Sequence, residues 1–156
     1  MIEVHVRRAE PWRRAAAWGV DGVPFLAGGV ALSRALVREA TVGVPGPVTG
    51  LDLLDFVARE RVIVLSVAAA VVLALGVYAT LAHALAGATF GKRLLHLRVV
   101  GPDGGRPSLA RSAARSALAF ASIAALGLGF LLALFTPSGR GLHDLVARTW
   151  VVDAQP

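Results

Sequence analysis

Residues 87–115, GATFGKRLLHLRVVGPDGGRPSLARSAAR, form a basic, turn-rich segment between two long stretches that carry no charge. No Lys, Arg, Asp or Glu occurs at positions 62–91, which run into this segment, or at positions 116–139, which follow it. About 20 apolar residues are enough to cross a hydrocarbon layer of roughly 30 Å. The pattern therefore predicts an integral membrane protein in which residues 87–115 form a platform at the membrane surface.

Composition supports the same class of protein. The chain has 156 residues, of which 56% are hydrophobic and 17% are charged, and its mean hydropathy is +0.67. These values are displaced from soluble-domain averages toward those of membrane proteins. The absence of Cys excludes disulfides and thiolate chemistry. The first residues, MIEVHVRRAEPWRR, lack the order of a signal peptide, so we expect the N-terminus to be retained.

The basic excess points to the lipid surface. The formal charge is +6 and the pI is about 11.4, a balance that nucleic-acid-binding proteins share. Here, however, the arginines flank apolar stretches and no nucleic-acid-binding motif occurs, so we expect a lipid bilayer as partner and no nucleic acid. The sequence also lacks a nucleotide-binding glycine loop, a paired-histidine zinc motif and a serine elbow. We therefore predict that the protein is not an enzyme and holds no cofactor or resident metal.

Three apolar segments predict an all-α membrane protein with three transmembrane helices, at residues 15–36, 62–86 and 117–135. Between Arg14 and Arg34, the first contains a single charge, Asp21, and several glycines, and we expect a helix break near Pro24. The second is the most uniformly apolar of the three. The third has 19 residues, which as a helix would be about 28 Å long and could just span the bilayer.

Charge asymmetry predicts the orientation. Ten Lys and Arg residues lie in the N-terminal segment and the platform, against four in and around the loop at residues 37–61. That loop is rich in Gly and Pro and also carries four acidic residues. The positive-inside bias places the N-terminus and the platform in the cytoplasm. We accordingly expect a multi-pass protein of the cytoplasmic (inner) membrane.

The platform contains short elements of its own. Residues 2–7 and 97–100 have the pattern of strands, residues 92–98 include a short basic helix or turn, and Ser108 is suited to cap a helix that begins at Leu109. A terminal strand at residues 149–152 would pair naturally with residues 97–100 or 2–6. Three crossings, however, would place the C-terminus outside. A re-entrant third segment, broken at Gly127 or Gly129, would resolve this conflict. We favour three crossings, because a broken helix facing lipid leaves backbone groups unpaired.

Several of these residues resemble one known family. The sequence has WRRAA at 12–16 with Asp21 downstream, TFGKRLL at 89–95 followed by LRVV at 97–100, and FTP at 135–137 before GLHDLVA at 141–147. This combination resembles the RDD membrane proteins over nearly the whole chain, with residues 37–61 as the variable part. Arg148, at a position where a small residue is expected, and Pro24, close after Asp21, depart from the family pattern.

The resemblance implies a function and a set of residues. Arg14 corresponds to the family arginine, Asp21 to the first aspartate and Asp144 to the second. The function of most members is unknown, but some exchange sodium, lithium or potassium for protons. The resemblance therefore implies a small transporter whose partners are a monovalent cation and a proton.

On physical grounds, Asp21 is the strongest candidate for a functional residue. A carboxylate inside a membrane segment costs a few kcal/mol, so it normally faces a partner or a water-filled cavity. There it could bind either a proton or a cation. Arg14 lies two helical turns earlier, about 10 Å away on the same face, and could reach partway to it. Alternatively, Asp21 caps a helix that begins near Pro24, or pairs with an arginine from another helix.

Other polar residues have two interpretations each. Asp144 beside His143 could form a proton relay, because His titrates near neutrality. The alternative is a surface helix in which Asp144 pairs with Lys92, Arg93 or Arg148. A second histidine, His83, fits a residue at the membrane interface or a hydrogen bond between helices better than a ligand site. Gly87 and Gly91 have a spacing that permits close helix approach.

The sequence thus supports two functions. The first is cation/proton exchange at Asp21, with Arg14 as its electrostatic partner and with Asp144 and His143 near the cytoplasmic opening. The second is a non-transporting scaffold or accessory subunit whose basic platform docks lipid or a partner protein. Because three crossings barely enclose a path, we expect a homo-oligomer in either case.

Overall fold

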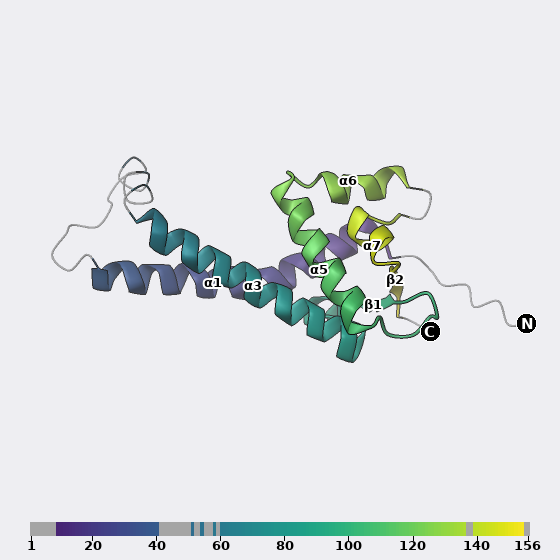
Figure 1. Cartoon of the computed structure of the whole chain (residues 1–156). Coiled ribbons are helices and arrows are strands. Elements are labelled where there is room, and N and C mark those ends of the chain that lie inside the picture. Colours follow the sequence, from purple (N-terminus) through teal and green to yellow (C-terminus); the bar gives the residue numbers. More distant parts are fainter. Residues whose placement is uncertain are drawn as a thin grey trace, which may run out of the picture. The chain divides into compact units, whose positions relative to one another are not determined.

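The computed structural model describes residues 9–40, 51, 54, 58, 60–136 and 139–154. Within these ranges the chain is mostly helical, as expected (Figure 1). Its elements in chain order are α1 (Pro11–Ala40), α3 (Arg61–Ala86), α4 (Phe90–Leu94), β1 (Leu97–Val100), α5 (Leu109–Ala124), α6 (Leu128–Phe135), α7 (Leu142–Val146) and β2 (Trp150–Asp153). The strand expected at residues 2–7 and most of the loop expected at residues 37–61 lie outside the described residues.

The chain divides into two compact units. The larger unit combines the segment up to Gly22 with everything from Leu75 onward, and the smaller one is Val23–Ala74. The smaller unit contains the second part of α1 and the first part of α3. These helices approach closely at Gly29, where an added Cβ would lie 2.7 Å from Cγ2 of Val71. Most of the other large apolar side chains in this unit, including Leu26 and Leu73, are exposed.

Both long helices are suited to lipid. Residues Pro11–Glu39 and Arg61–Ala86 are long and apolar enough to cross a membrane, yet only 17% and 11% of their most apolar windows are buried inside the protein. The core helix of a soluble protein would be mostly covered by other parts of the chain. The exposed apolar surface is suited to a lipid environment, and the two helices correspond to the first two predicted crossings.

The course of α1 corrects two expectations. The helix runs without interruption from Pro11 to Ala40 with Pro24 inside it, so the break predicted near Pro24 is wrong. Proline already has a helical φ and removes only one backbone donor, a loss that membrane helices tolerate. The helix also extends beyond residue 36, so the loop predicted to begin at residue 37 begins later.

A small antiparallel sheet joins the chain's distant parts. β1 pairs with β2, with Leu97 opposite Asp153 and Val100 opposite Trp150. This confirms the pairing expected between residues 97–100 and the C-terminal strand. The N-terminal segment attaches to the same sheet, because Ala9 N–H donates to the carbonyl of Val151 at 3.3 Å. Leu97, Val99 and Val151 form a buried core together with Ala9 and Ala17.

The N-terminus of α5 is as predicted. Helix α5 begins at Leu109, and Ser108 Oγ accepts a hydrogen bond from Arg111 N–H at 3.4 Å, which supplies a partner for one of the free donors of the first turn. The short basic helix or turn expected within residues 92–98 corresponds to α4. This helix begins earlier than expected, at Phe90, and ends at Leu94.

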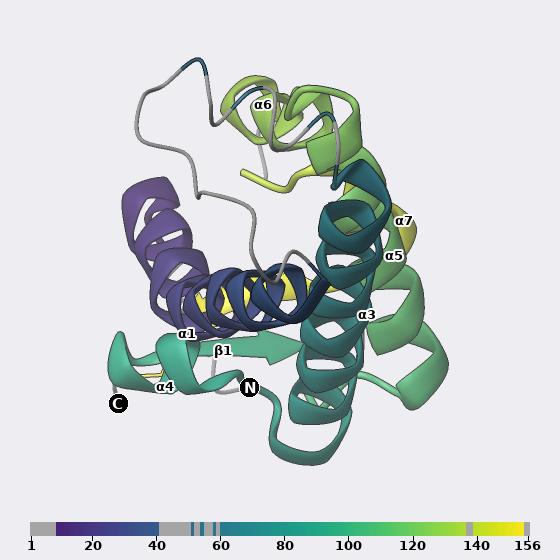
Figure 2. The same ribbon diagram turned by 90° about the vertical axis from the view of Figure 1, so that its left-hand side faces the viewer.

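The third predicted crossing is not one helix. Helix α5 ends at Ala124, Gly127 adopts a left-handed conformation with φ 81°, and α6 begins at Leu128 and has only eight residues. Figures 1 and 2 show α6 turning away from the axis of α5, with α7 beside α5. The break satisfies its own backbone, because Gly127 N–H donates to Ser122 O at 2.7 Å and Gly127 O accepts from Phe130 N–H at 2.8 Å. The alternative of a break at Gly127 is therefore the correct one for this segment.

Candidate functional site

The interior of the larger unit holds a group of charged side chains, which we call the charge cluster. Four of its members are at most 7% exposed, and the fifth is partly buried. They come from α1, α4, α5 and α7, and they interact electrostatically with one another. The members of the charge cluster are Arg14, Asp21, Lys92, Arg115 and Asp144. Charges that are this well buried need partners or a function.

Asp144 is the best-connected member. It is fully buried and receives two guanidinium groups, Arg115 Nη1 at 2.6 Å from Oδ1 and Arg14 Nη2 on Oδ2. Thr149 Oγ1 also donates to Oδ1 at 3.3 Å. Burial by itself would raise the pKa of Asp144, but the charge of Arg115, together with that of Arg14, outweighs burial and lowers it. Asp144 is therefore an ionised carboxylate that ties α7 to α1 and α5.

This geometry corrects the alternative interpretation of Asp144. Leu142 and Val146 of α7 are exposed, but His143 and Asp144 are buried. The partners proposed for Asp144, namely Lys92, Arg93 and Arg148, do not form its salt bridges. Arg148 instead occupies the turn before β2 with a positive φ of 51°. The turn brings Thr149 N–H to Asp144 O at 2.9 Å, which fixes the carboxylate relative to the sheet.

His143 is packed beside this carboxylate. Its ring lies 4.8 Å from the ring of Phe130, and Nε2 is 3.5 Å from Asp144 Oδ2. Burial lowers the pKa of His143 to about 4, although the charge of Asp144 opposes this effect. His143 is consequently neutral at pH 7, which disfavours a relay that changes its charge near neutrality.

Asp21 has a separate set of partners. It is 7% exposed, and its Oδ1 accepts hydrogen bonds from Gly91 N–H at 2.7 Å and from Tyr78 O–H at 3.1 Å. The Tyr78 oxygen in turn accepts from Phe90 N–H at 2.8 Å, so the N-terminus of α4 is anchored to α1 and α3. A Cβ at Gly91 would overlap the carbonyl oxygen of Ala17. Only glycine therefore fits between α4 and α1 at this position. This agrees with the close helix approach expected at Gly91.

The predicted pairing of Arg14 with Asp21 is wrong. Arg14 extends to Asp144 and to Gly139 O, the latter at 2.7 Å, while Asp21 faces α4. Partners at direct hydrogen-bonding distance outcompete one that lies about two helical turns away. Asp21 also lies inside α1, so it does not cap a helix near Pro24, and no arginine pairs with it among the residues that the structure describes.

Sequence reasoning missed two members of the charge cluster, Arg115 and Lys92. Their place in the basic platform predicts exposed side chains, but each is 2% exposed. Lys92 differs from Arg115 in having no carboxylate partner among the described residues. Its Nζ lies 5.4 Å from the centroid of the Trp18 ring, and within the described ranges it makes no salt bridge or hydrogen bond. Burial, followed by the charge of Arg115, lowers the pKa of Lys92 to about 7, although Asp21 and Asp144 oppose the change. The sequence feature that could have indicated its burial is its position directly after the uncharged run at 62–91.

His83 is also buried, at 2% exposed. Both of its ring nitrogens lack a hydrogen-bond partner in the described part of the chain, so the helix–helix hydrogen bond expected of it is not formed. The hydroxyls of Thr89 and Ser112 are likewise buried and unpaired there. These groups give the interior of the larger unit polar surface beyond the charge cluster.

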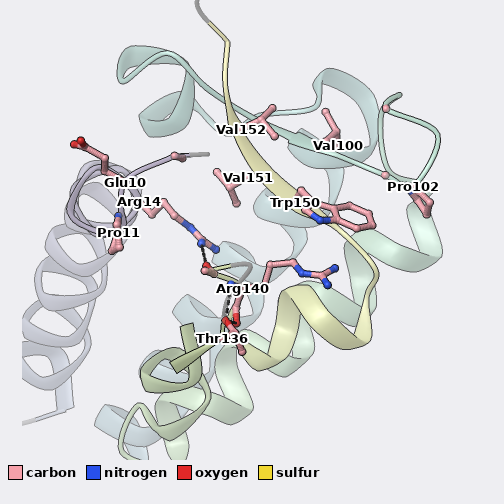
Figure 3. A pocket seen from close by; sticks show the side chains of 14 residues that line it. Glu10, Pro11, Arg14, Val100, Pro102, Thr136, Arg140, Trp150, Val151 and Val152 are labelled. Carbon is pink, nitrogen blue, oxygen red and sulfur yellow. Dashed lines mark hydrogen bonds between the residues drawn. The ribbon is translucent and has the colours of Figure 1, made fainter. Parts of the chain in front are cut away.

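Two cavities meet at Arg14. One, of about 660 Å³, lies between the start of α1, the turn after β1 and the start of β2, and Arg14 reaches into it toward the loop that carries Arg140 (Figure 3). The other, of about 410 Å³, is lined by Trp18, Phe130 and His143 among others. The salt bridge between Arg14 and Asp144 therefore lies where both cavities approach the charge cluster.

Comparison with known proteins gives one match. The profile of the RDD family matches residues 8–148, which include every member of the charge cluster. No curated protein and no solved structure matches the sequence. The match covers nearly the whole chain, and it agrees with the two long apolar helices. This membrane protein therefore belongs to the RDD family.

Proposed function

We propose that the protein is a small transporter that exchanges a monovalent cation for a proton, with Asp21 as the cation-binding carboxylate. One observation carries the proposal. Asp21 is buried in a membrane helix, and both hydrogen bonds to its carboxylate end on Oδ1, while Oδ2 has no partner among the described residues. A carboxylate oxygen of this kind is a suitable ligand for a hard monovalent cation.

The remaining charges have supporting roles in this proposal. Arg14 and Arg115 neutralise Asp144, so that pair of salt bridges holds α1, α5 and α7 together around the site. Asp144 is saturated by two guanidinium groups and is therefore a poor cation ligand. We assign the transported cation to Asp21 and a bracing role to Arg14, Asp144 and the neighbouring His143.

The connectivity also supports a topology. Ala9 is hydrogen-bonded to β2, and β2 pairs with β1, which supports placing residue 9 and residues 150–153 on one side of the membrane. We propose that α1 and α3 cross and that the hairpin of α5 and α6 enters and returns on the same side. The positive-inside bias makes that side the cytoplasm of a cytoplasmic (inner) membrane protein.

Flux measurements test the exchange. Purified protein is reconstituted in liposomes with an imposed pH gradient, and proton movement is recorded with Na⁺, K⁺ or Li⁺ outside. We expect cation-dependent proton movement that Asp21→Asn abolishes and Asp103→Asn preserves, because Asp103 lies on an exposed turn. Equal flux in the Asp21→Asn variant and the wild type would refute the role of Asp21.

The scaffold function is favoured by a different observation. Arg93, Arg98 and Arg106 of the platform are exposed, whereas Lys92 and Arg115 are buried. A docking surface for anionic lipid would use the three exposed arginines. The Arg93→Glu and Arg106→Glu double variant should then lose binding to vesicles containing anionic lipid. Under exchange alone, the same variant should keep its flux.

Self-association is part of the proposal in both cases. Two crossing helices and one short hairpin enclose little space, and the described faces of α1 and α3 expose many apolar side chains. We propose a homo-oligomer, which the mass of the protein in detergent, measured by light scattering, would establish.

A further inference from the structure

The choice of basic residue at position 92 is unusual for this chain. Fifteen of its basic residues are arginine, and Lys92 is the single lysine. Arginine keeps its proton at any physiological pH, whereas a buried lysine can release it. Among the lysine and arginine side chains, the one able to release its proton readily is thus also a buried one that makes no salt bridge within the described ranges.

Lys92 faces charged or titratable groups from four other segments. Arg14 and Asp21 face it from α1, His83 from α3, Arg115 from α5, and Asp144 together with His143 from α7. Asp144 already has two arginine partners, and Oδ1 of Asp21 is held by hydrogen bonds. The charges of Asp21 and Asp144 favour the charged ammonium, and the Trp18 ring, 5.4 Å from Nζ, provides a further favourable contact.

The charge cluster carries a net positive charge when Lys92 is protonated. Arg14, Arg115 and Lys92 then supply three positive charges against the two carboxylates of Asp21 and Asp144. Loss of one proton from Lys92 leaves the cluster neutral without moving any other group. Burial favours this neutral state, and it brings the pKa of Lys92 to about 7, within the physiological range.

We propose that Lys92 carries the proton of the exchange and that its charge controls the affinity of Asp21 for the cation. This inference rests on the exchange proposed above and assigns the two exchanged species to two different side chains. The step is balanced: the ammonium of Lys92 releases one proton and becomes a neutral amine, and one monovalent cation binds at Asp21. The total charge of the cluster does not change.

The coupling is electrostatic and reciprocal. The negative charge of Asp21 helps to keep the proton on Lys92. A cation bound at Asp21 cancels that help, so it promotes proton release, and a proton on Lys92 must weaken cation binding to the same degree. Proton and cation therefore compete without sharing an oxygen atom.

The single lysine makes the titration directly measurable. Protein labelled with [6-¹³C]lysine in detergent micelles should give one lysine Cε resonance, from Lys92. We expect a midpoint near pH 7 in choline chloride and a lower midpoint in NaCl, KCl or LiCl at the same ionic strength, with the difference absent in Asp21→Asn. A midpoint near the 10.5 of a solvated lysine, or one unaffected by these cations, would overturn the inference.

Flux then separates this inference from the proposed function. In liposomes, Lys92→Arg keeps the positive charge but cannot release a proton, so we expect loss of cation-driven proton movement. Arg93→Lys, at the exposed neighbouring position, should keep wild-type flux. Wild-type flux in Lys92→Arg would overturn the role of Lys92 while leaving exchange intact. Absence of flux in the wild type would overturn the proposed exchange itself, and the resonance measurement would still decide whether Lys92 and the cation are coupled.

Discussion

Replacement of Lys92 by methionine should stabilise the folded protein at low pH and lose this advantage as the pH rises. Methionine has the same unbranched shape but needs no charge in the buried site. Below pH 7 the folded wild type must hold an ammonium group where burial disfavours it, so its stability is reduced by the full cost of that burial. The substitution removes this cost.

The magnitude follows from the pKa. Burial lowers the pKa of Lys92 from 10.5 to about 7. Between these values the unfolded chain keeps a proton that the folded chain has released, so wild-type stability rises with pH by about 1.4 kcal/mol per pH unit. From pH 7 to pH 9 the wild type should gain about 3 kcal/mol, while Lys92→Met gains nothing from this position. The difference between the two proteins should therefore shrink by that amount.

Equilibrium unfolding in mixed detergent micelles, followed by tryptophan fluorescence at pH 6, 7, 8 and 9, measures this difference. The control is Arg93→Met, which removes an exposed charge next in sequence and should give a difference that does not change with pH. A gap between Lys92→Met and the wild type that stays constant from pH 6 to pH 9 would show that Lys92 is solvated and would refute the reasoning.

Three further predictions concern the same unit. Gly91→Ala should lower the free energy of unfolding by about 1–3 kcal/mol or prevent folding, because the new methyl group meets the backbone oxygen of Ala17; thermal unfolding in detergent checks this. Asp144→Asn should cost about 3–5 kcal/mol, because it leaves two buried guanidinium groups without their countercharge; unchanged denaturant midpoints would contradict it. His143 should make the wild type lose about 3 kcal/mol between pH 6.5 and pH 4, because the unfolded chain binds a proton there and the folded chain does not; a His143→Gln variant, unfolded across the same pH series, should lack this loss.

Local signals in the sequence predicted local structure well. The uncharged run at 62–86 corresponds to α3, Ser108 caps α5, and the β-branched and apolar residues at 97–100 form β1. In each case, neighbouring residues contain the whole physical reason, namely apolar length, a capping hydroxyl or a strand pattern. The pairing of β1 with the C-terminal strand was also predicted, because both segments have the pattern of strands and would pair naturally.

The partners of the charged side chains could not be predicted in this way. Helical spacing placed Arg14 and Asp21 on one face of α1, but spacing along one helix says nothing about which other element packs against each turn. Arg14 lies at the level of α7 and meets Asp144, while Asp21 lies two turns later at the level of α4 and meets Gly91. Long-range packing decided these contacts, and only a structure reveals it.

The third apolar segment shows why hydropathy left the topology open. A run of 19 uncharged residues has the same composition whether it forms one helix or a hairpin, so the cost of unpaired backbone groups favoured the single helix. That cost does not arise here, because Gly127 reaches a left-handed conformation that lets its own N–H and C=O bond to residues on either side of the break. Once the break is free of this penalty, sheet formation between β1 and β2 is compatible with the proposed topology, in which the hairpin enters and returns on the same side. A Gly127→Val variant, strained at φ 81°, should therefore weaken the pairing of β2 with β1, although the two sites are far apart in sequence. Faster hydrogen exchange at Val151 and Val152 would be the measured sign, and unchanged protection would show that the hairpin and the sheet form independently.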